Sequence, residues 1–340
     1  MLPPRQGAKP APCLGYIRKA EIPSNVRESD SLIKYTIKRL LQTLIVLLGV
    51  SLITFVMLNI APGDPVGVML EKRADQETID RVRHEMGLDR PYVEQYLSFV
   101  KGAVVGDFGD SYFQHKPVSE ILGEAFQITA SLGVWVIIFS ILLGMLFGIS
   151  AAVLRGGWGD KLIILISTLG MAMPSFWIAI ILQIVFGLRL KILPISGLQN
   201  MSGYVLPTIS LGMIYAASIA RLCRTNMLDA LNQDYVRTAR AKGVSEFKIV
   251  MEHGLKNAAI PIITYIGILI KSILGGSVLV ETVFSIPGLG KTMVDAITQR
   301  DISLIQGCTI YIAVVFVLAN LVIDLVYGLL DPRIRVAQEG

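Results

Sequence analysis

Cysteine, histidine and charge are all scarce in this sequence. Its 340 residues include 3 cysteines and 3 histidines, and only 17% of the chain is charged. Cys13 lies in a polar N-terminal segment, and Cys223 and Cys308 lie at the ends of two different apolar segments, so they predict neither a metal cluster nor a disulfide framework. No His-Glu-x-x-His motif, Ser-His pair or pair of intramembrane aspartates is present. The three isolated histidines are His84, His115 and His253. We therefore predict no catalytic residue, no metal site and no cofactor.

Apolar residues dominate the composition. The chain is 53% hydrophobic with a mean hydropathy of +0.61, and a soluble protein of this length could not bury so much apolar surface. A helix needs about 20 apolar residues to cross the roughly 30 Å hydrocarbon core of a bilayer. The sequence therefore predicts an all-α, polytopic membrane protein with six transmembrane helices. The predicted spans are Leu40 to Ile60, Ile128 to Val153, Leu162 to Phe186, Leu206 to Leu222, Ala258 to Val280 and Cys308 to Leu330.

The segment before the first span differs from the rest of the chain. Five prolines and little apolar content predict that residues 1–31 form a disordered tail. The apolar run that follows has about 21 residues, whereas the core of a signal peptide has about 7 to 15, so we expect the first span to be retained.

Lysine and arginine are distributed unevenly between the two sides of the predicted spans. With both termini in the cytoplasm, the inner segments hold 19 Lys and Arg residues and the outer segments hold 11, although the longest loop is outside. Because basic residues accumulate on the cytoplasmic side, this count predicts that both ends, including the tail, are cytoplasmic. The net charge of +5 thus reflects topology. Without an aromatic-interleaved basic face, it does not indicate binding to nucleic acid.

The longest outer segment is residues 61–127, between the first and second spans. Gln76 to Met86 is helix-like and highly charged, and Val93 to Val104 repeats apolar residues at helical spacing. We predict that residues 32–127 form the first span and a small extracytoplasmic helical cap. The pattern leaves open whether this cap is a simple structured loop or a surface that contacts a partner.

A polar, basic loop, residues 226–257, connects the fourth and fifth spans. Asn226 to Ala241 has helix-compatible spacing, Gly243 breaks it, and Glu246 begins a second amphipathic helix. The small side chains of Ala239 and Ala241 keep one face thin, so another protein can approach closely, and Arg237, Arg240 and Lys242 give that surface charge. The loop is therefore either a docking surface or a basic segment that simply obeys the positive-inside rule. Its candidate docking residues are Asp234, Tyr235, Arg237, Thr238, Ala239, Arg240, Ala241, Lys242, Gly243 and Glu246.

Six short motifs occur in order along the chain. Each is weak alone, but their order and spacing together are highly specific. They are Pro62-Gly63-Asp64-Pro65, Gly87-Leu88-Asp89-Arg90-Pro91, Asp107-Phe108-Gly109-x-Ser111, Met173-Pro174-Ser175-Phe176-Trp177, the run Glu281 to Gly290, and Asp331-Pro332-Arg333. Together with the polar loop, they resemble ABC importer permeases of the dipeptide, oligopeptide and nickel family, over residues of about 32–336. The loop has Arg237-Thr238-Ala239 where the general importer pattern has Glu-Ala-Ala, and this departure resembles the peptide-type variant.

This resemblance implies a type I ABC importer permease fold, with residues 128–336 as the core and residues 226–257 as a cytoplasmic coupling loop. It implies a subunit without enzymatic activity in a bacterial cell membrane. Its expected partners are a homologous second permease, two cytoplasmic ATPase subunits that hydrolyse ATP, an extracytoplasmic substrate-binding protein and the lipid bilayer. Small peptides are the expected substrate, and nickel or a metal chelate is the alternative because the motifs are shared.

Charged and amide side chains inside the spans are few. Lys271 lies mid-depth in the fifth span, and Asn320 and Asp324 lie four residues apart on one face of the sixth. Counted from the span ends, Lys271 and Asp324 differ in depth by roughly 10 Å, which a lysine would only partly bridge. These residues are predicted either to bond neighbouring helices or to line the pathway. An ion relay through them would instead indicate a secondary transporter, for which we find no convincing repeat.

Glycine and proline mark candidate contacts and bends within the spans. Gly144 and Gly148 form a GxxxG pair that predicts close helix packing. Gly275 and Gly276 interrupt the fifth span and are candidate hinges. Pro174 predicts a kink in the third span, either static or a gating hinge.

One outer segment has a misleading motif. Gly288 to Thr292 ends like a phosphate-binding loop, but Ser285 stands where that motif requires glycine, and no strand precedes it. We predict a tight turn, a surface helix over Met293 to Arg300, and no binding of ATP.

Overall fold

The computed structural model describes residues 28–60, 66–67, 75–85, 87–198 and 200–330. The chain divides into two units, Met1–Leu44 and Ile45–Gly340, and every candidate site residue lies in the second. Residues 1–27 of the predicted tail lie outside the described residues, and residues 28–31 belong to helix α1 (Glu28–Ile60). The motifs at residues 62–65 and 331–333 also lie outside them.

The described part of the chain is all-helical, as predicted, apart from one hairpin whose two strands have two residues each. By length and composition, 5 described helices can cross a membrane, or up to 6 if a bent pair counts as one span. The single helices are α1, α5 (Val118–Val153), α8 (Val205–Leu231), α11 (Lys256–Gly276) and α14 (Ile302–Leu330). The bent pair is α6 (Trp158–Ala172) and α7 (Ser175–Leu182), with the π-helix η1 (Gln183–Arg189) continuing α7.

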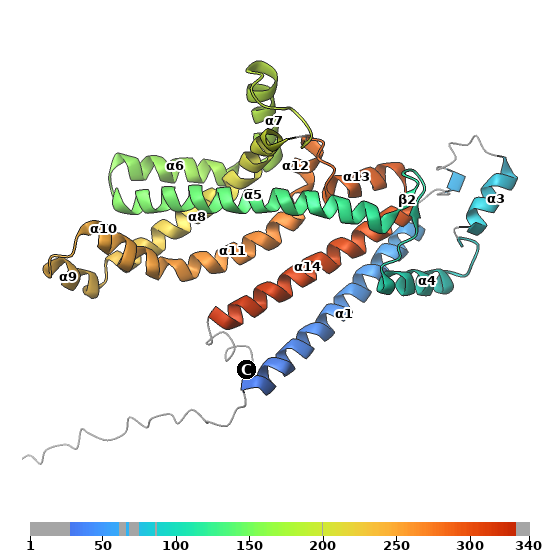
Figure 1. Cartoon of the computed structure of the whole chain (residues 1–340), viewed down its shortest axis with the longest axis horizontal. Helices are drawn as coiled ribbons and strands as arrows, with labels where there is room; N and C mark the ends of the chain where they lie inside the picture. The colour runs from blue at the N-terminus through green and yellow to red at the C-terminus, as the bar shows by residue number, and fades with distance from the viewer. Residues whose placement is uncertain (1–27, 61–65, 68–74, 86, 199, 331–340) are drawn as a thin grey trace, which may run out of the picture. The chain divides into compact units, whose positions relative to one another are not determined.

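The third predicted span is broken more sharply than a kinked helix. The helices before and after Pro174 are bent by 102°, and α7 turns away from the axis of α6 in Figure 1. Proline disfavours helical backbone in the residue before it, and Met173 is extended, with ψ 133°. Pro174 is extended as well, with ψ 140°. Two consecutive extended residues interrupt the helix, so Leu162 to Phe186 is not one continuous helix.

The two glycines of the GxxxG pair lie where α5 packs on α8. A methyl group on Gly144 would lie 2.8 Å from the carbonyl oxygen of Ala216, and one on Gly148 would lie 2.8 Å from that of Ala220. The predicted close packing is therefore confirmed, because no larger residue fits there without a shift of the backbone. The same core includes buried side chains of α11, such as Leu269.

The fifth span continues directly from the polar loop. Helix α10 (Glu246–Lys248) runs through the π-helix η3 (Ile249–Leu255) into α11, so the second loop helix is not separate. Helix α11 ends at Gly276, four residues before the predicted end of the span, and a short helix α12 (Val278–Val283) follows. Helix α13 (Leu289–Gln299) begins earlier than the predicted surface helix, and its residues Leu289, Thr292 and Ala296 are buried. It is therefore a half-buried helix rather than a surface one.

The cap contains two helices close to the predicted ones. They are α3 (Gln76–Glu85) and α4 (Tyr92–Val105). A short antiparallel hairpin follows, in which β1 (Asp110–Ser111) pairs with β2 (Lys116–Pro117). The hairpin is anchored to the membrane core, because the Ser111 hydroxyl donates a hydrogen bond of 2.6 Å to the buried carboxylate of Asp301, which precedes α14.

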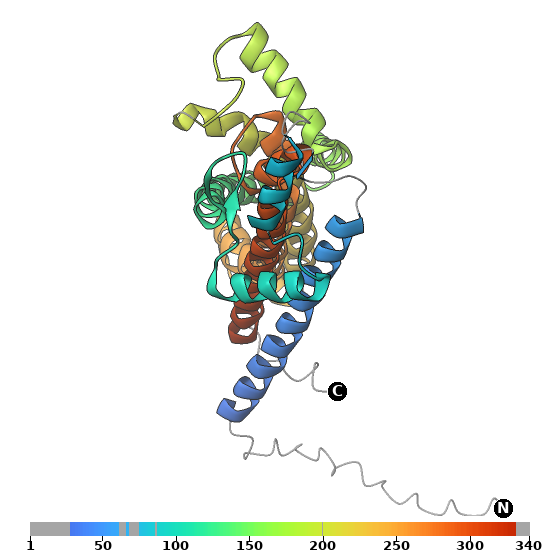
Figure 2. The same cartoon turned by 90° about the vertical axis from the view of Figure 1, so that its right-hand side faces the viewer.

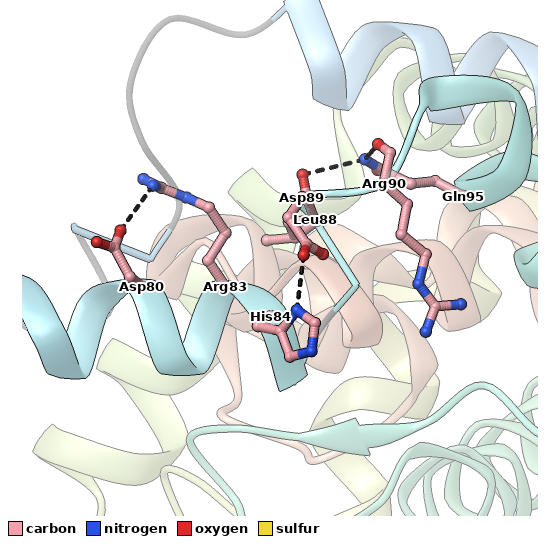
Figure 3. A network of polar contacts seen from close by, with 7 residues as sticks. All are labelled: Asp80, Arg83, His84, Leu88, Asp89, Arg90 and Gln95. Carbon is pink, nitrogen blue, oxygen red and sulfur yellow. Dashed lines mark hydrogen bonds and ion pairs between the residues drawn. The ribbon is translucent and has the colours of Figure 1, made fainter.

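Side chains around the link between α3 and α4 form a small polar network (Figure 3). His84 Nδ1 lies 2.6 Å from Asp89 Oδ2, and the hydrogen bond with His84 lowers the pKa of the Asp89 carboxyl. Gln95 donates to the carbonyl oxygens of Leu88 and Arg90 at 3.2 and 2.8 Å. The Gly87 to Pro91 motif therefore forms a turn in which two carbonyl groups accept hydrogen bonds from Gln95, near the start of α4.

Candidate functional site

The polar loop folds as a short helix, a glycine turn and the start of a long helix. Helix α9 (Asp234–Ala241) ends before Gly243, which has the left-handed φ of +79°. The amide groups of Gly243 and Val244 donate to the carbonyl oxygens of Arg240 and Ala239. This C-terminal cap favours glycine because other residues are strained at positive φ. The predicted break at Gly243 is therefore confirmed. Figure 1 shows α9 and α10 at one end of α8 and α11.

On one side of the loop, apolar side chains of the loop pack against one another. Val236 and Ile249 are fully buried, and Ala239 is 8% exposed in the same cluster. Leu231 and Val244 pack against them. The sequence placed Ala239 on the thin docking face, and this was wrong, because Ala239 lies one turn from Val236 and shares its inward face. The cluster fixes the orientation of α9 against the following helix.

Charged residues on the other side pair within the loop. Arg240 makes a two-pronged bond to Glu246 across the glycine turn, at 2.7 and 3.2 Å, and this bond raises the pKa of Arg240. Arg237 lies 3.3 Å from Asp234. The face is therefore of mixed charge rather than simply basic. The remaining candidate residues Thr238, Ala241 and Lys242 are exposed beside them.

Tyr235 connects the loop helix to the fifth span. Its hydroxyl oxygen accepts a hydrogen bond of 3.0 Å from Asn257 in α11, and its ring lies 5.9 Å from that of His253. His253 thus has a packing role that its isolation in the sequence concealed.

Phe247 is an exposed residue that the sequence reasoning missed. It lies in α10 between Glu246 and Lys248, and its side chain is 77% exposed. A large apolar side chain in an otherwise charged stretch was the available signal. Phe247 thus adds an aromatic group to the exposed side of the loop.

A second group that the sequence reasoning missed joins the N-terminal end of α6 to the C-terminal part of α8. Asp160, which is 3% exposed, accepts two hydrogen bonds from Arg224 at 2.6 and 2.8 Å and one from the Gly156 amide at 3.0 Å. Nearby, Arg155 donates to the Asn232 side chain at 2.9 Å. These contacts connect the short α5–α6 link to the part of α8 that leads into α9.

The intramembrane charges meet despite their predicted difference in depth. Lys271 Nζ in α11 lies 3.7 Å from Asp324 Oδ1 in α14, and both side chains are partly buried. Counting from span ends failed because α11 ends at Gly276 and the chain passes through α12 and α13 before α14 begins. The two helix ends are therefore not level. Asn320 is half-buried one turn from Asp324.

The segment that resembles a phosphate-binding loop holds a carboxylate of its own chain. Glu281 is fully buried, and its carboxylate accepts hydrogen bonds from the amides of Gly290 and Lys291, at 2.8 and 3.1 Å, and from the Thr129 hydroxyl at 2.9 Å. A methyl group on Gly288 would lie 2.6 Å from this carboxylate. The first turn of α13 thus binds an internal anion, in keeping with the preference of helix N-termini for negative charge.

Comparison with known proteins fits this arrangement of five or six candidate spans. A family model described as "Binding-protein-dependent transport system inner membrane component" matches residues 144–336. A second, described as "Binding-prot-dependent transport system membrane comp, N-term", matches residues 32–133. The chain belongs to this permease family. It is accordingly a non-catalytic, multi-pass inner membrane subunit of an ABC importer with the type I permease fold.

Full-length relatives support the same assignment. The "Glutathione transport system permease protein GsiC" of Escherichia coli (strain K12) is 40% identical over 304 residues, which is 89% of this permease and 99% of that protein. Proteins of the same name from Shigella flexneri serotype 5b and Salmonella paratyphi A are 40% and 39% identical, with the same coverage. This permease therefore belongs to the peptide family of importers, which in general work with ATPase and binding-protein partners.

Proposed function

We propose that this chain is a transmembrane subunit of an ATP-driven importer of small peptides, and that residues 234–247 dock on a cytoplasmic ATPase. The exposed side of the loop carries the proposal. Its apolar side is occupied by Val236 and Ile249 within the chain, and yet Phe247 remains 77% exposed between charged residues. Aromatic side chains surrounded by polar groups are typical anchors of protein interfaces.

The loop is also connected so that force on α9 reaches the spans. The apolar cluster attaches α9 to Leu231 at the end of α8, and Tyr235 attaches it to Asn257 in α11. The Asp160–Arg224 pair extends the connection to α6. A rigid connector of this kind moves the attached helices together when a partner clamps it.

In this proposal a homologous second permease completes the pathway, two ATPase subunits bind from the cytoplasm, and an extracytoplasmic binding protein delivers the substrate. Both termini of the chain are cytoplasmic. Small peptides are favoured because relatives of 40% identity are named for transport of glutathione, itself a small peptide. The choice among peptides is expected to rest with the binding protein.

The test is copurification of the permease with the proteins encoded beside it, followed by ATPase measurements. Phe247→Ala should weaken association with the ATPase at least tenfold, which corresponds to about 1.4 kcal/mol of lost binding. Gly243→Pro combined with Arg240→Glu should abolish it, because the turn and its clamp are lost. Phe113→Ala, a partly exposed phenylalanine in the cap, is the matched control and should bind the ATPase normally.

Three results would contradict the proposal in different ways. Normal association of Phe247→Ala would exclude this loop surface. Stimulation of the ATPase by nickel-loaded but not by peptide-loaded binding protein would replace the substrate class. Transport that follows an ion gradient without any ATPase would overturn the importer function and make Lys271 and Asp324 the residues to study.

A further inference from the structure

Helix α4 of the cap displays a stripe of large apolar side chains. Val93, Leu97 and Val104 are 69, 60 and 81% exposed, and α4 contains no buried residue. With Val100, they recur every three or four residues, so they lie along one face of the helix. A helix surrounded by water gains nothing from such a stripe, because exposed apolar side chains are better buried.

The contacts of α4 place it beside the apolar part of α1. The Tyr96 hydroxyl lies 2.9 Å from the Ser51 hydroxyl, and the Tyr96 ring lies 5.4 Å from that of Phe55. Figures 1 and 2 show α4 next to α1 and crossing its direction. Phe55 and Ser51 precede the end of α1 at Ile60 by five and nine residues, which is about 7.5 and 13.5 Å along a helix.

These distances correspond to the depth of one membrane leaflet. Half of the hydrocarbon core is about 15 Å thick, so with Ile60 at the membrane surface, as the predicted span places it, Tyr96 meets α1 at the level of the acyl chains rather than above the membrane. Near this contact, α1 itself exposes Leu52 and Val56, as a lipid-facing helix does. The stripe of α4 therefore lies beside a surface that already faces lipid.

One flank of α4, next to the stripe, is polar. Glu94, Ser98 and Lys101 are exposed there, about a quarter of a turn around the helix from the stripe at roughly 100° per residue. A helix with one apolar and one polar side, and with tyrosines at its margin, is typical of segments that lie in the membrane interface.

We propose that α4 is an interfacial helix whose stripe, Val93, Leu97, Val100 and Val104, inserts into the acyl chains of the leaflet at the Ile60 end of α1. In the predicted orientation this is the outer leaflet. The cap is then fastened to the bilayer surface on the side from which, in the proposed function, the binding protein delivers the substrate. The depth of the Tyr96 contact favours lipid over a protein partner as the group that covers the stripe.

The test uses single-cysteine variants of the assembled transporter in lipid nanodiscs, labelled with an environment-sensitive fluorophore. Cys223 and Cys308 are buried, and Cys13 is replaced by serine. Leu97→Cys and Val104→Cys report the stripe, and Ser98→Cys reports the polar side. Labels at 97 and 104 should be quenched severalfold more by lipids with nitroxide-bearing acyl chains than the label at 98, which aqueous iodide should quench instead.

Two results would overturn the proposal. Equal quenching by iodide at positions 97 and 98 would place α4 in water. Protection of positions 97 and 104 from both quenchers would show that a protein, such as a second permease, covers the stripe. Because ATPase docking is not measured in this experiment, its outcome is independent of the proposed function of the cytoplasmic loop.

Discussion

The polar loop and the segment made of α12, the following turn and the start of α13 each place a glycine next to a short helix, and each contains a glutamate that accepts at least two hydrogen bonds. In the loop, Glu246 is exposed and its partner is the guanidinium group of Arg240. In the second segment, Glu281 of α12 is fully buried and its partners are the amides of Gly290 and Lys291 and the hydroxyl of Thr129.

The difference shows which parts of each segment determine its shape. The loop owes its orientation to the buried side chains of Val236 and Ile249, so its charged face is available to a partner. The turn owes its shape to the carboxylate itself, since the groups around Glu281 have no solvent to replace it. A surface pair in water contributes little, whereas a buried acceptor that is removed leaves its donors unsatisfied.

The largest expected effect follows from changing the buried carboxylate. Glu281→Gln keeps the shape of the side chain but places an amide nitrogen against the donors of α13 or of Thr129. We expect it to destabilise the permease by about 2–4 kcal/mol, because charge-assisted bonds are lost and a buried donor is left unpaired. Thermal unfolding of the purified protein in detergent measures this change.

The same substitution in the loop is the control. Because the Glu246 side chain is exposed, Glu246→Gln should leave the unfolding temperature unchanged within error. If the two variants unfolded at the same temperature, the buried network would not determine the shape of the turn, and the contrast between the two segments would fail.

Glycine substitutions give a smaller, graded version of this comparison. A methyl group on Gly290 would lie 2.6 Å from Val278 Cα, in a packed region, so Gly290→Ala should cost about 1–3 kcal/mol. Gly243 has open space around it, so Gly243→Ala creates no clash. Only the strain of an alanine at positive φ remains, and it should lower the free energy of unfolding by about 1 kcal/mol. Chemical unfolding of the two variants should therefore rank Gly290→Ala as the less stable. The reverse order would indicate that backbone conformation, not crowding, limits these positions.

Local patterns in the sequence predicted much of this structure. Periodicity and glycine placement predicted α3, α4, the break at Gly243 and the GxxxG contact, because each depends on residues a few positions apart. The bond between Thr129 and Glu281 joins residues 152 positions apart, and no local pattern reveals such a partner. Pro174 located the break in the third span, but its 102° angle also depends on the extended backbone of Met173.

Two candidate residues show a further limit of sequence reasoning. Ala239 was assigned to the docking face from its size, and the structure turns it inward, because the side that a helix buries is decided by its neighbours. Lys271 and Asp324 were separated by counting from the span ends, and they meet because the spans do not end at one level. In both cases the missing information was tertiary.

The smallest expected effect concerns the exposed clamp, and it separates two roles for Arg240. Arg240→Glu and Glu246→Arg each place like charges across the Gly243 turn, so each should reduce stimulation of the ATPase modestly while leaving the unfolding temperature unchanged. The double exchange restores the pair in reverse. If Arg240 serves only to hold the turn, the double variant should regain most of the stimulation, and the coupling between the two sites appears as non-additivity. If Arg240 contacts the ATPase directly, the double variant stays impaired, because the partner then meets a carboxylate where it binds a guanidinium.

Phe247→Ala in the same assay should reduce stimulation of the ATPase more than either single reversal, since the loss of an apolar anchor from an interface costs more binding free energy than the loss of an exposed ion pair.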